Sequence, residues 1–281
     1  MKELIIEQPK GDRIVDQLAS AYYALKQLDK DEKAKFDLSK LKFVSPLLVS
    51  MLAIYINDTE SDCILPKDEA VSSYLNTIAF PKGLTSISNI QHLKNYLPLS
   101  LIQKTSDIIK KEEIISCFVN LIDKLIGKIP NTQNAVFQPI FELVSNIFEH
   151  SKRDFGMILG QTFPKKGCLE ICIIDRGRGL AASYKQEMNL IYTDEEALKQ
   201  SMLGKSTKRD KERGFGVRTS KNIVCEALGG EFMMLSGNAT LISTQNSDRT
   251  VILPNFYWQG VIISYRIPFP KQAINIYPYL E

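Results

Sequence analysis

Residues 137–151 read FQPIFELVSNIFEHS, and this stretch says most about the fold of the chain. Wound as a helix, it gathers its large apolar side chains on one face and polar side chains on the other. Glu142 and Asn146 lie four residues apart on the polar face, so their side chains project side by side. Contact with solvent is the common explanation of such a face. The spacing also suits a site in which one of the two side chains ligates Mg²⁺ and the other polarises a nucleophile near the same phosphate.

A second informative stretch, residues 168–179, reads CLEICIIDRGRG. It predicts a strand that ends in Asp175, followed by Gly177 and Gly179, which let a flat ligand approach the backbone closely. The carboxylate of Asp175 can accept a hydrogen bond from an exocyclic amine. An ordinary strand-to-loop turn is the alternative. Gly177-x-Gly179-x-x-Ala182 also fits the dinucleotide fingerprint, which expects an acid after a second parallel strand; Glu195 and Glu196 lie in a helix-like run with no strand before it.

The third stretch, residues 201–216, reads SMLGKSTKRDKERGFG and leads into a predicted helix. Gly204-Lys205-Ser206 resembles part of a P-loop, but Lys199 occupies the position of the required glycine. What remains is a basic loop that ends in Gly214-Phe215-Gly216 at the start of a helix, where backbone N–H groups bind phosphate. A solvated surface loop is the alternative.

The order of these three stretches resembles the GHKL ATPases, which include histidine-kinase catalytic domains, anti-sigma-factor serine kinases, gyrase-type topoisomerases and mismatch-repair ATPases. Glu142-Leu-Val-Ser-Asn146 resembles the N box of that family. Asp175-Arg-Gly177-Arg-Gly179 resembles its first glycine box, and Gly214-Phe-Gly216-Val217 its second. Asn146-Ile-Phe-Glu-His150 is similar to the anti-sigma serine-kinase branch, whereas His92 lacks the helical surroundings of a phosphoacceptor histidine.

The resemblance covers about residues 108 to 270 and implies a site for Mg²⁺ and ATP. By position, Glu142 would be the general base, and Asn146 would bind Mg²⁺ and the nucleotide. Asp175 would bind the adenine amino group, with Gly177 and Gly179 supporting the base pocket. The residues implied near the phosphates are Lys205, Ser206, Thr207, Gly214, Gly216 and Val217.

The N-terminal part of the chain alternates short strands and helices, which is typical of a small β-sheet covered by helices. Within it, residues 36–48 (FDLSKLKFVSPLL) resemble the STAS (anti-sigma antagonist) domain. In that family a phosphorylatable serine follows this strand, but here Leu47 occupies its position, and Ser45 stands where an aspartate is usual. Ser45 is better explained as the N-cap of a helix whose first turn holds Pro46.

These features predict an α/β protein with two domains. Residues 1–95 would form a STAS-like regulatory domain and residues 96–110 a linker. Residues 111–281 would form a GHKL-type ATP-binding domain, an α+β two-layer sandwich with a mixed sheet covered by helices. The expected helices span 13–28, 46–56, 70–79, 112–128, 136–151 and 217–228; the expected strands span 2–7, 35–38, 63–65, 155–163 and 168–175, with a strand-rich tail over 231–268.

The composition places the chain among ordinary globular proteins. Hydrophobic residues are 44% and charged residues 24% of the chain, and the net charge is +3. This balance argues against disorder and gives no reason to expect nucleic acid as a partner. The apolar stretch 43–56 is too short to span a membrane. The five cysteines are scattered without a CxxC motif, so neither a disulfide framework nor a zinc site is expected, and the cytoplasm fits best.

The expected function is that of an Mg·ATP-binding regulatory protein, a serine/threonine kinase in a partner-switching pathway. Its expected partner is a STAS-domain or sigma-factor-like regulator, and a homodimer is a further expectation. One alternative is an ATPase whose nucleotide cycle closes a lid over residues 183–213 to gate a partner or a dimer. The other is a module that binds the nucleotide without catalysis. Glu142 argues against that module, because a binder needs no base, but nothing in the sequence separates a kinase from an ATPase.

Overall fold

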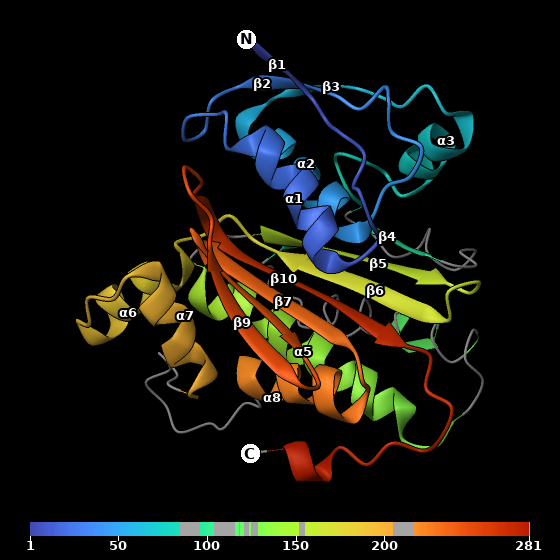
Figure 1. The fold of residues 1–281 in the computed structure, drawn as a ribbon, viewed down its shortest axis with the longest axis vertical. Coiled ribbons are helices and arrows are strands. Elements are labelled where there is room, and N and C mark those ends of the chain that lie inside the picture. Colours follow the sequence, from blue (N-terminus) through green and yellow to red (C-terminus); the bar gives the residue numbers. More distant parts are fainter. Residues whose placement is uncertain are drawn as a thin grey trace.

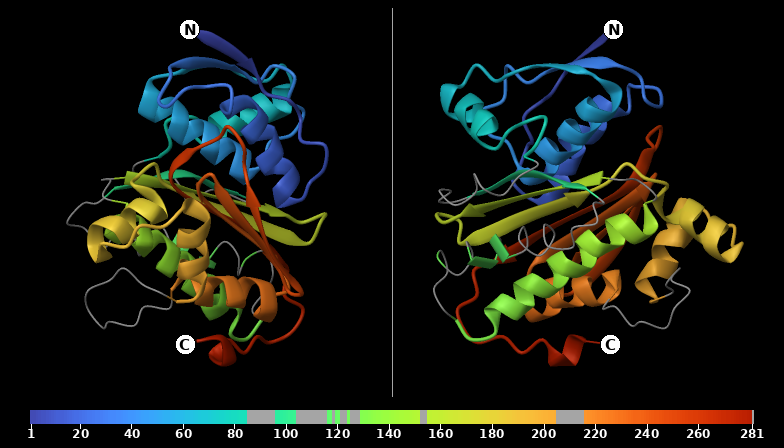
Figure 2. Two further views of the ribbon diagram at one scale, coloured as in Figure 1. Left: turned by 60° about the vertical axis from the view of Figure 1, so that its left-hand side comes forward. Right: turned by 180° about the vertical axis from the view of Figure 1, so that it is seen from behind.

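The computed structural model describes residues 1–84, 96–103, 116–117, 119–120, 124, 129–151, 155–204 and 216–280, without the side chains of residues 103 and 147–150. The described chain is a mixed α/β protein arranged in layers (Figures 1 and 2). A small sheet of three strands lies outermost. Helices α1 and α2 separate it from a sheet of seven strands, whose far face carries the remaining large helices.

The N-terminal block, residues 1–84, alternates strands and helices as the sequence predicts. Its elements are β1 (Lys2–Ile5), α1 (Ile14–Leu25), β2 (Ala34–Asp37), α2 (Pro46–Thr59), β3 (Asp62–Ile64) and α3 (Glu69–Thr77). The strands pair in parallel in the order β1-β2-β3. Parallel neighbours need a crossover connection, and α1 and α2 supply it here.

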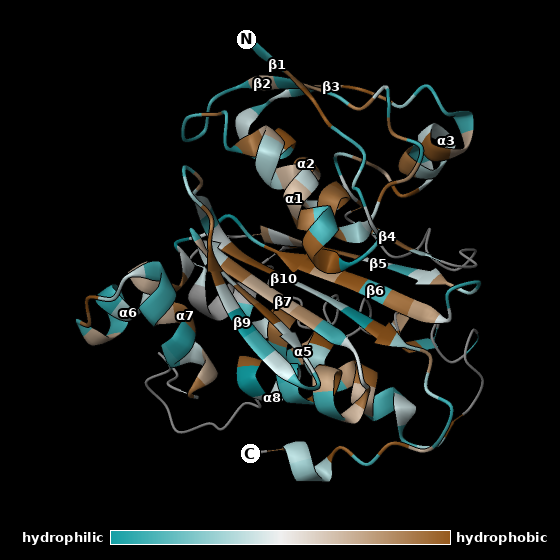
Figure 3. Ribbon diagram, viewed as in Figure 1, coloured by the Kyte–Doolittle hydropathy of each residue, from teal (hydrophilic) through white to brown (hydrophobic). Residues whose placement is uncertain are grey.

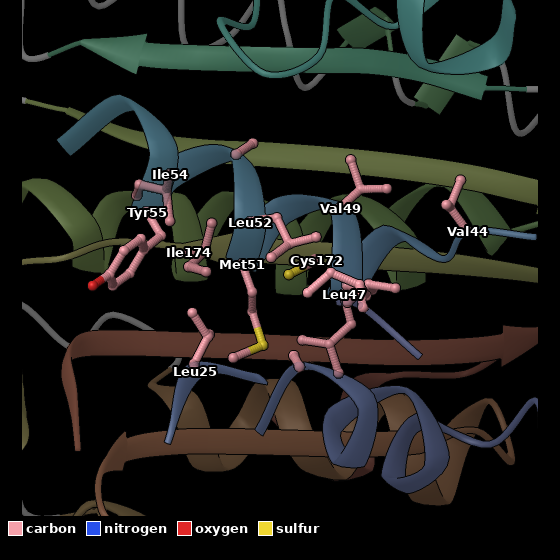
Figure 4. Close-up of a cluster of buried hydrophobic side chains, with 14 of the residues drawn as sticks. Leu25, Val44, Leu47, Val49, Met51, Leu52, Ile54, Tyr55, Cys172 and Ile174 are labelled. Atoms are coloured by element: carbon pink, nitrogen blue, oxygen red, sulfur yellow. The ribbon is translucent and has the colours of Figure 1, made fainter. Parts of the chain in front are cut away.

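Helix α2 begins where the sequence predicts. The side chain of Ser45 accepts a hydrogen bond from the N–H of Leu48 at 3.5 Å, and Pro46 occupies the first turn. Every residue from 46 to 56 is buried, so the helix is apolar on all sides. Its place between two sheets explains this, as Figure 4 shows for the side chains that reach Cys172 and Ile174.

The second sheet has the strand order β4-β5-β6-β10-β7-β8-β9. Its strands are β4 (Tyr96–Gln103), β5 (Phe155–Phe163), β6 (Cys168–Ile174), β7 (Glu231–Gly237), β8 (Ala239–Thr244), β9 (Ser247–Ile252) and β10 (Trp258–Pro268). All its neighbouring strands pair antiparallel, so the expectation of a mixed sheet is wrong for this part of the chain. Short turns at 164–167, 238 and 245–246 connect neighbouring strands, and such turns force antiparallel pairing.

The strand β4 corrects a second expectation, because residues 96–103 belong to the predicted linker. They form the edge of the seven-stranded sheet and pair with β5. The register shifts between Leu97 and Ser100, around Pro98. Proline has no N–H for the ladder and is tolerated at an edge, so its presence hid a strand that the apolar residues around it support. The expected helix over 112–128 lies largely outside the described residues.

The two faces of the seven-stranded sheet belong to different cores, because successive side chains of a strand alternate between faces. Met157, Cys172, Ile174 and Leu235 face α1 and α2. The opposite face packs against the helices that follow β4 in the chain. The side chains that form this second core include Ile158, Ile171, Ile173, Phe232, Met234, Ile263 and Tyr265. Strand β6 is buried along its whole length because both of its faces are covered. The apolar strands and the polar outer helices are visible in Figure 3.

The helices that cover the far face are α5 (Thr132–His150), α6 (Gly179–Met188), α7 (Asp194–Met202) and α8 (Val217–Asn222), which continues into the π-helical turn η2 (Ile223–Ala227). The chain ends in a short 3-10 helix, η3 (Tyr277–Tyr279). Helix α5 starts at residue 132, four residues earlier than the predicted 136. No helix in the described part of the chain is both long and apolar enough to cross a membrane.

Helices α6 and α7 occupy residues 183–188 and 194–202 of the expected lid over 183–213, of which the structure describes 183–204. A capping box joins Thr193 and Glu196 at the start of α7. Leu198 is fully buried and packs with Leu241 of β8. Thr193-x-x-Glu196 is a helix-start signal that the prediction did not use.

Candidate functional site

Helix α5 carries Glu142 and Asn146, as the sequence predicts. Glu142 is only 6% exposed, and Asn146 is partly buried. A polar helix face that met solvent alone would leave its carboxylate in water, so that interpretation is wrong for Glu142. Burying a carboxylate is unfavourable unless other groups in the protein compensate, which makes this residue a candidate for a specific role.

Asp175 lies at the end of β6 and is 4% exposed. Its Oδ1 accepts a hydrogen bond from the N–H of Gly177 at 2.7 Å. Its own N–H donates to the carbonyl of Val261 at 2.9 Å, and its carbonyl accepts from Nε1 of Trp258 at 3.1 Å. Side-chain and backbone bonds therefore fix both the position and the rotamer of this carboxylate.

A bulge in β10 makes room for Asp175. The register between β10 and β7 shifts between Trp258 and Val261, and Gly260 within the bulge has φ +106°. A Cβ atom on Gly260 would overlap the carbonyl oxygen of Asp175 and lie 2.7 Å from its Oδ1. The motif patterns missed Gly260, although an isolated glycine in an apolar strand is a recognised signal of a bulge or a close approach.

The loop after Asp175 is seated on the C-terminal end of α5. The N–H of Arg178 donates to the carbonyl of Ser151 at 3.0 Å. A Cβ atom on Gly177 would overlap the carbonyl oxygen and Cβ of Ser151. Ser151 follows Asn146 by five residues, which corresponds to about 8 Å along a helix axis. The structure thus brings the second predicted motif against the helix that carries the first.

The C-terminal part of the same loop, at the start of α6, is hydrogen-bonded to the seven-stranded sheet. Gly179 has φ +76° at the start of α6. The N–H of Leu180 donates to Oγ of Ser236 on β7 at 3.0 Å, and that hydroxyl donates to the carbonyl of Gly260 at 2.9 Å. Ser236 is a further residue that the sequence motifs did not reveal, because its partners lie far away along the chain.

Helix α8 packs beside α5 on the same face of the sheet. Gly216 is its N-cap, with φ −60° and ψ −174°, and Val217 is its first residue. A Cβ atom on Gly216 would meet nothing within 4 Å among the described residues. Four other predicted phosphate contacts, Lys205, Ser206, Thr207 and Gly214, lie outside the described residues, as does His92.

Arg178 and Tyr184 make contacts within α6 and with the segment that follows it. Arg178 Nη1 forms an ion pair with Glu187 at 2.9 Å and a hydrogen bond with Gln186 at 2.7 Å. Tyr184 is 1% exposed, and burial raises the pKa of its hydroxyl, so it stays neutral at physiological pH. Its ring lies edge-on to Tyr192, with 5.4 Å between ring centroids.

The oxygen atoms of Glu142 and Asn146 are of the kind that Mg²⁺ prefers. Among the described residues no group of three or more His, Cys, Asp and Glu side chains could hold a metal ion. Mg²⁺ in nucleotide sites is usually held by one or two protein oxygens together with phosphate oxygens, and these residues fit that pattern.

All five cysteines are free.

Comparison with protein-family models, with curated proteins and with solved structures finds no match for this chain.

Proposed function

We propose that this chain is an Mg·ATP-binding regulatory protein of the GHKL class that phosphorylates a serine or threonine of a partner protein. The observation that carries the proposal is the contact of the Asp175 loop with Ser151 at the end of α5, with α8 beside it. The first two motifs and the described end of the third, Gly216 and Val217, thereby lie on one face of the sheet. A surface loop or a solvated helix face would not require this convergence.

In the proposed complex the carboxylate of Asp175 accepts a hydrogen bond from the amino group of adenine. The bond from the N–H of Gly177 orients that carboxylate before the ligand arrives, which lowers the cost of binding. Asn146 would hold Mg²⁺ through its amide oxygen, and the bound ion would supply positive charge beside the phosphates. The glycine at position 216 lets the start of α8 approach the phosphates closely.

Glu142 acts as the general base in this proposal. Its carboxylate takes the proton of the acceptor hydroxyl while the hydroxyl oxygen bonds to the γ-phosphorus, and the bond between that phosphorus and the bridging oxygen of ADP breaks. The burial of Glu142 supports the role, because a base works best where water does not compete. Water in place of the hydroxyl would make the same machinery an ATPase.

The test uses the full chain and ATP labelled at the γ-phosphate, alone and with candidate partners of the STAS-domain or sigma-factor-like kind. Label on a partner's serine or threonine is the expected result. Label in inorganic phosphate alone would replace the kinase by an ATPase, and bound but unconsumed ATP would leave a non-catalytic module. Absence of ATP binding would overturn the whole proposal.

A further inference from the structure

Arg176 follows Asp175 directly, yet its side chain leaves the face that carries α5. It is 6% exposed and reaches the N-terminal block. Its Nη2 lies 2.6 Å from Oδ1 of Asp31 in the turn before β2, and its Nη1 lies 3.6 Å from Oδ2 of Asp58 on α2. The residue after the proposed adenine contact is therefore held by a different layer of the molecule.

Two aromatic rings complete the surroundings of Arg176. The centre of its guanidinium group lies 4.6 Å from the ring centroid of Tyr55 on α2 and 5.7 Å from that of Trp258. A guanidinium group at such a distance from a ring is attracted by the ring's electrons. Trp258 also donates to the carbonyl of Asp175, so the same ring contacts both consecutive residues. Figure 4 shows Tyr55 at the end of α2 near Ile174, the residue that precedes Asp175.

Burial of an ion pair is not in itself evidence of a role, since desolvation offsets much of the attraction. Asp31 provides a second observation. Its side chain is 54% exposed, and its backbone adopts the left-handed conformation with φ +59°. A surface carboxylate in a special turn thus reaches a buried arginine, and whatever binds or moves that turn acts on the loop of Asp175.

We propose that Arg176 is a positioning residue of the nucleotide site, through which the N-terminal block sets the geometry of the Asp175–Gly177 turn. The part of this inference that concerns nucleotide binding rests on the proposed function. It gives the N-terminal block a regulatory role, because contacts to Asp31, Asp58 and Tyr55 favour the turn that binds adenine. Coupling between two sites is reciprocal, so nucleotide binding should in return protect the turn around Asp31.

The first arm of the test needs no nucleotide. Hydrogen exchange of the full chain is measured at the amides of Gly177 and Arg178, which are bonded to Asp175 and Ser151. Arg176→Met should speed this exchange roughly tenfold, the effect of losing a charged hydrogen bond. Arg176→Lys, which keeps the charge, should restore part of the protection. Asp31→Asn should act in the same direction as Arg176→Met without unfolding the protein, because asparagine tolerates the left-handed conformation.

Lys166→Met is the matched control, because Lys166, in the turn between β5 and β6, also bonds to the N-terminal block, at Oδ2 of Asp12 at 2.8 Å, but through an exposed ion pair. It should leave the amides of Gly177 and Arg178 unchanged. Equal acceleration in both variants, or none in Arg176→Met and Asp31→Asn, would overturn the proposal.

The second arm measures ADP binding by calorimetry. Arg176→Met and Asp31→Asn should weaken the affinity, with Lys166→Met near wild type. If wild-type protein binds no ADP, the proposed function fails, while the exchange arm still decides whether Arg176 positions the turn. If wild type binds ADP and the variants bind it equally well, the positioning role is refuted and the proposed function stands.

Discussion

Helices α2 and α5 lie on opposite faces of the seven-stranded sheet and differ in what they bury (Figures 1 and 3). Residues 46–56 of α2 are all buried, and nearly all are apolar. Helix α5 buries Ile140, Leu143 and Val144 against the sheet, but it also buries the carboxylate of Glu142.

The difference between the two helices distinguishes residues that packing requires from a residue that packing alone does not require. Helix α2 lies between two sheets, so an apolar surface on all sides is what burial requires of it. Helix α5 needs apolar residues toward the sheet, and apolar packing alone does not require the carboxylate of Glu142. Packing between two sheets accounts for the composition of α2, whereas the buried acid of α5 is what the proposed function would explain.

The largest expected effect is on turnover, at Glu142. Glu142→Gln should lower the rate of γ-phosphate consumption by roughly 10²–10⁴-fold, the usual contribution of a general base. Affinity for Mg·ATP should stay close to wild type, because a base acts mainly in the transition state. Steady-state phosphate release and calorimetry measure the two quantities.

Two further variants serve as comparisons for Glu142→Gln. Asn146→Ala should weaken binding and turnover together, because it removes a metal ligand. Glu69→Gln, at an exposed glutamate of α3, is the matched control and should change neither. Wild-type turnover in Glu142→Gln would show that this buried acid serves the fold and not the reaction.

The next effect concerns the face covered by α2. Leu47 is fully buried. Leu47→Ala should lower the free energy of unfolding by about 2–5 kcal/mol, the usual cost of a cavity in a close-packed core. ATP turnover per folded molecule should not change, because Leu47 lies at the start of α2, whereas Tyr55 and Asp58, which contact Arg176, lie near its other end. Urea denaturation checks the first point. A loss below about 1 kcal/mol would show that α2 is loosely packed.

A smaller effect on stability is expected at Gly177, where the loop after Asp175 contacts the end of α5. Gly177→Ala places a methyl group against the backbone of Ser151 and should cost about 1–3 kcal/mol by overpacking. It should also push the Asp175 turn away from α5 and weaken ATP binding. Gly11→Ala is the control, since its methyl group would meet only the flexible side chain of Asp16. Equal stability and affinity in both variants would contradict the seating of the loop on α5.

The smallest expected effect is a pH dependence at Glu170 on β6, which faces α1. Burial raises the pKa of this carboxyl above 4.5, although Arg266 and Gln17 oppose the shift. The folded protein therefore holds the proton more tightly than the unfolded chain, so this group's contribution to stability falls as pH rises from 4.5 toward neutrality.

Glu170→Gln should remove that part of the pH dependence, about 1.4 kcal/mol for each unit by which the pKa is raised. The measurement is the free energy of unfolding from acid to neutral pH, with Glu69→Gln as the control. Parallel curves for wild type and Glu170→Gln would contradict the raised pKa.

The sequence predicted the elements whose signals are local. Ser45 and Pro46 marked the start of α2, and the alternation of strands and helices in residues 1–84 was confirmed. Edge strand β4 was missed because Pro98 concealed it. The helix-like run around Glu195 and Glu196 is α7, but its capping signal at Thr193 was not used.

The candidate site was predicted only as far as its motifs. Glu142, Asp175 and Gly177 could be identified because each belongs to a short motif with a characteristic spacing. Contacts between distant segments carry no local signal, so the seating of Gly177 on Ser151 and the reach of Arg176 to Asp31 could be found only from the fold.

The central claim is that the face of α5 binds adenine nucleotides through Asp175. Calorimetry of the full chain with ATP and Mg²⁺ tests it most directly, in wild type and in Asp175→Asn. The account predicts measurable binding that depends on Mg²⁺, and a loss of affinity of roughly ten- to a hundredfold in Asp175→Asn, where a donor replaces the acceptor of the adenine amino group. No binding by wild type, or equal affinity in the two proteins, would contradict it.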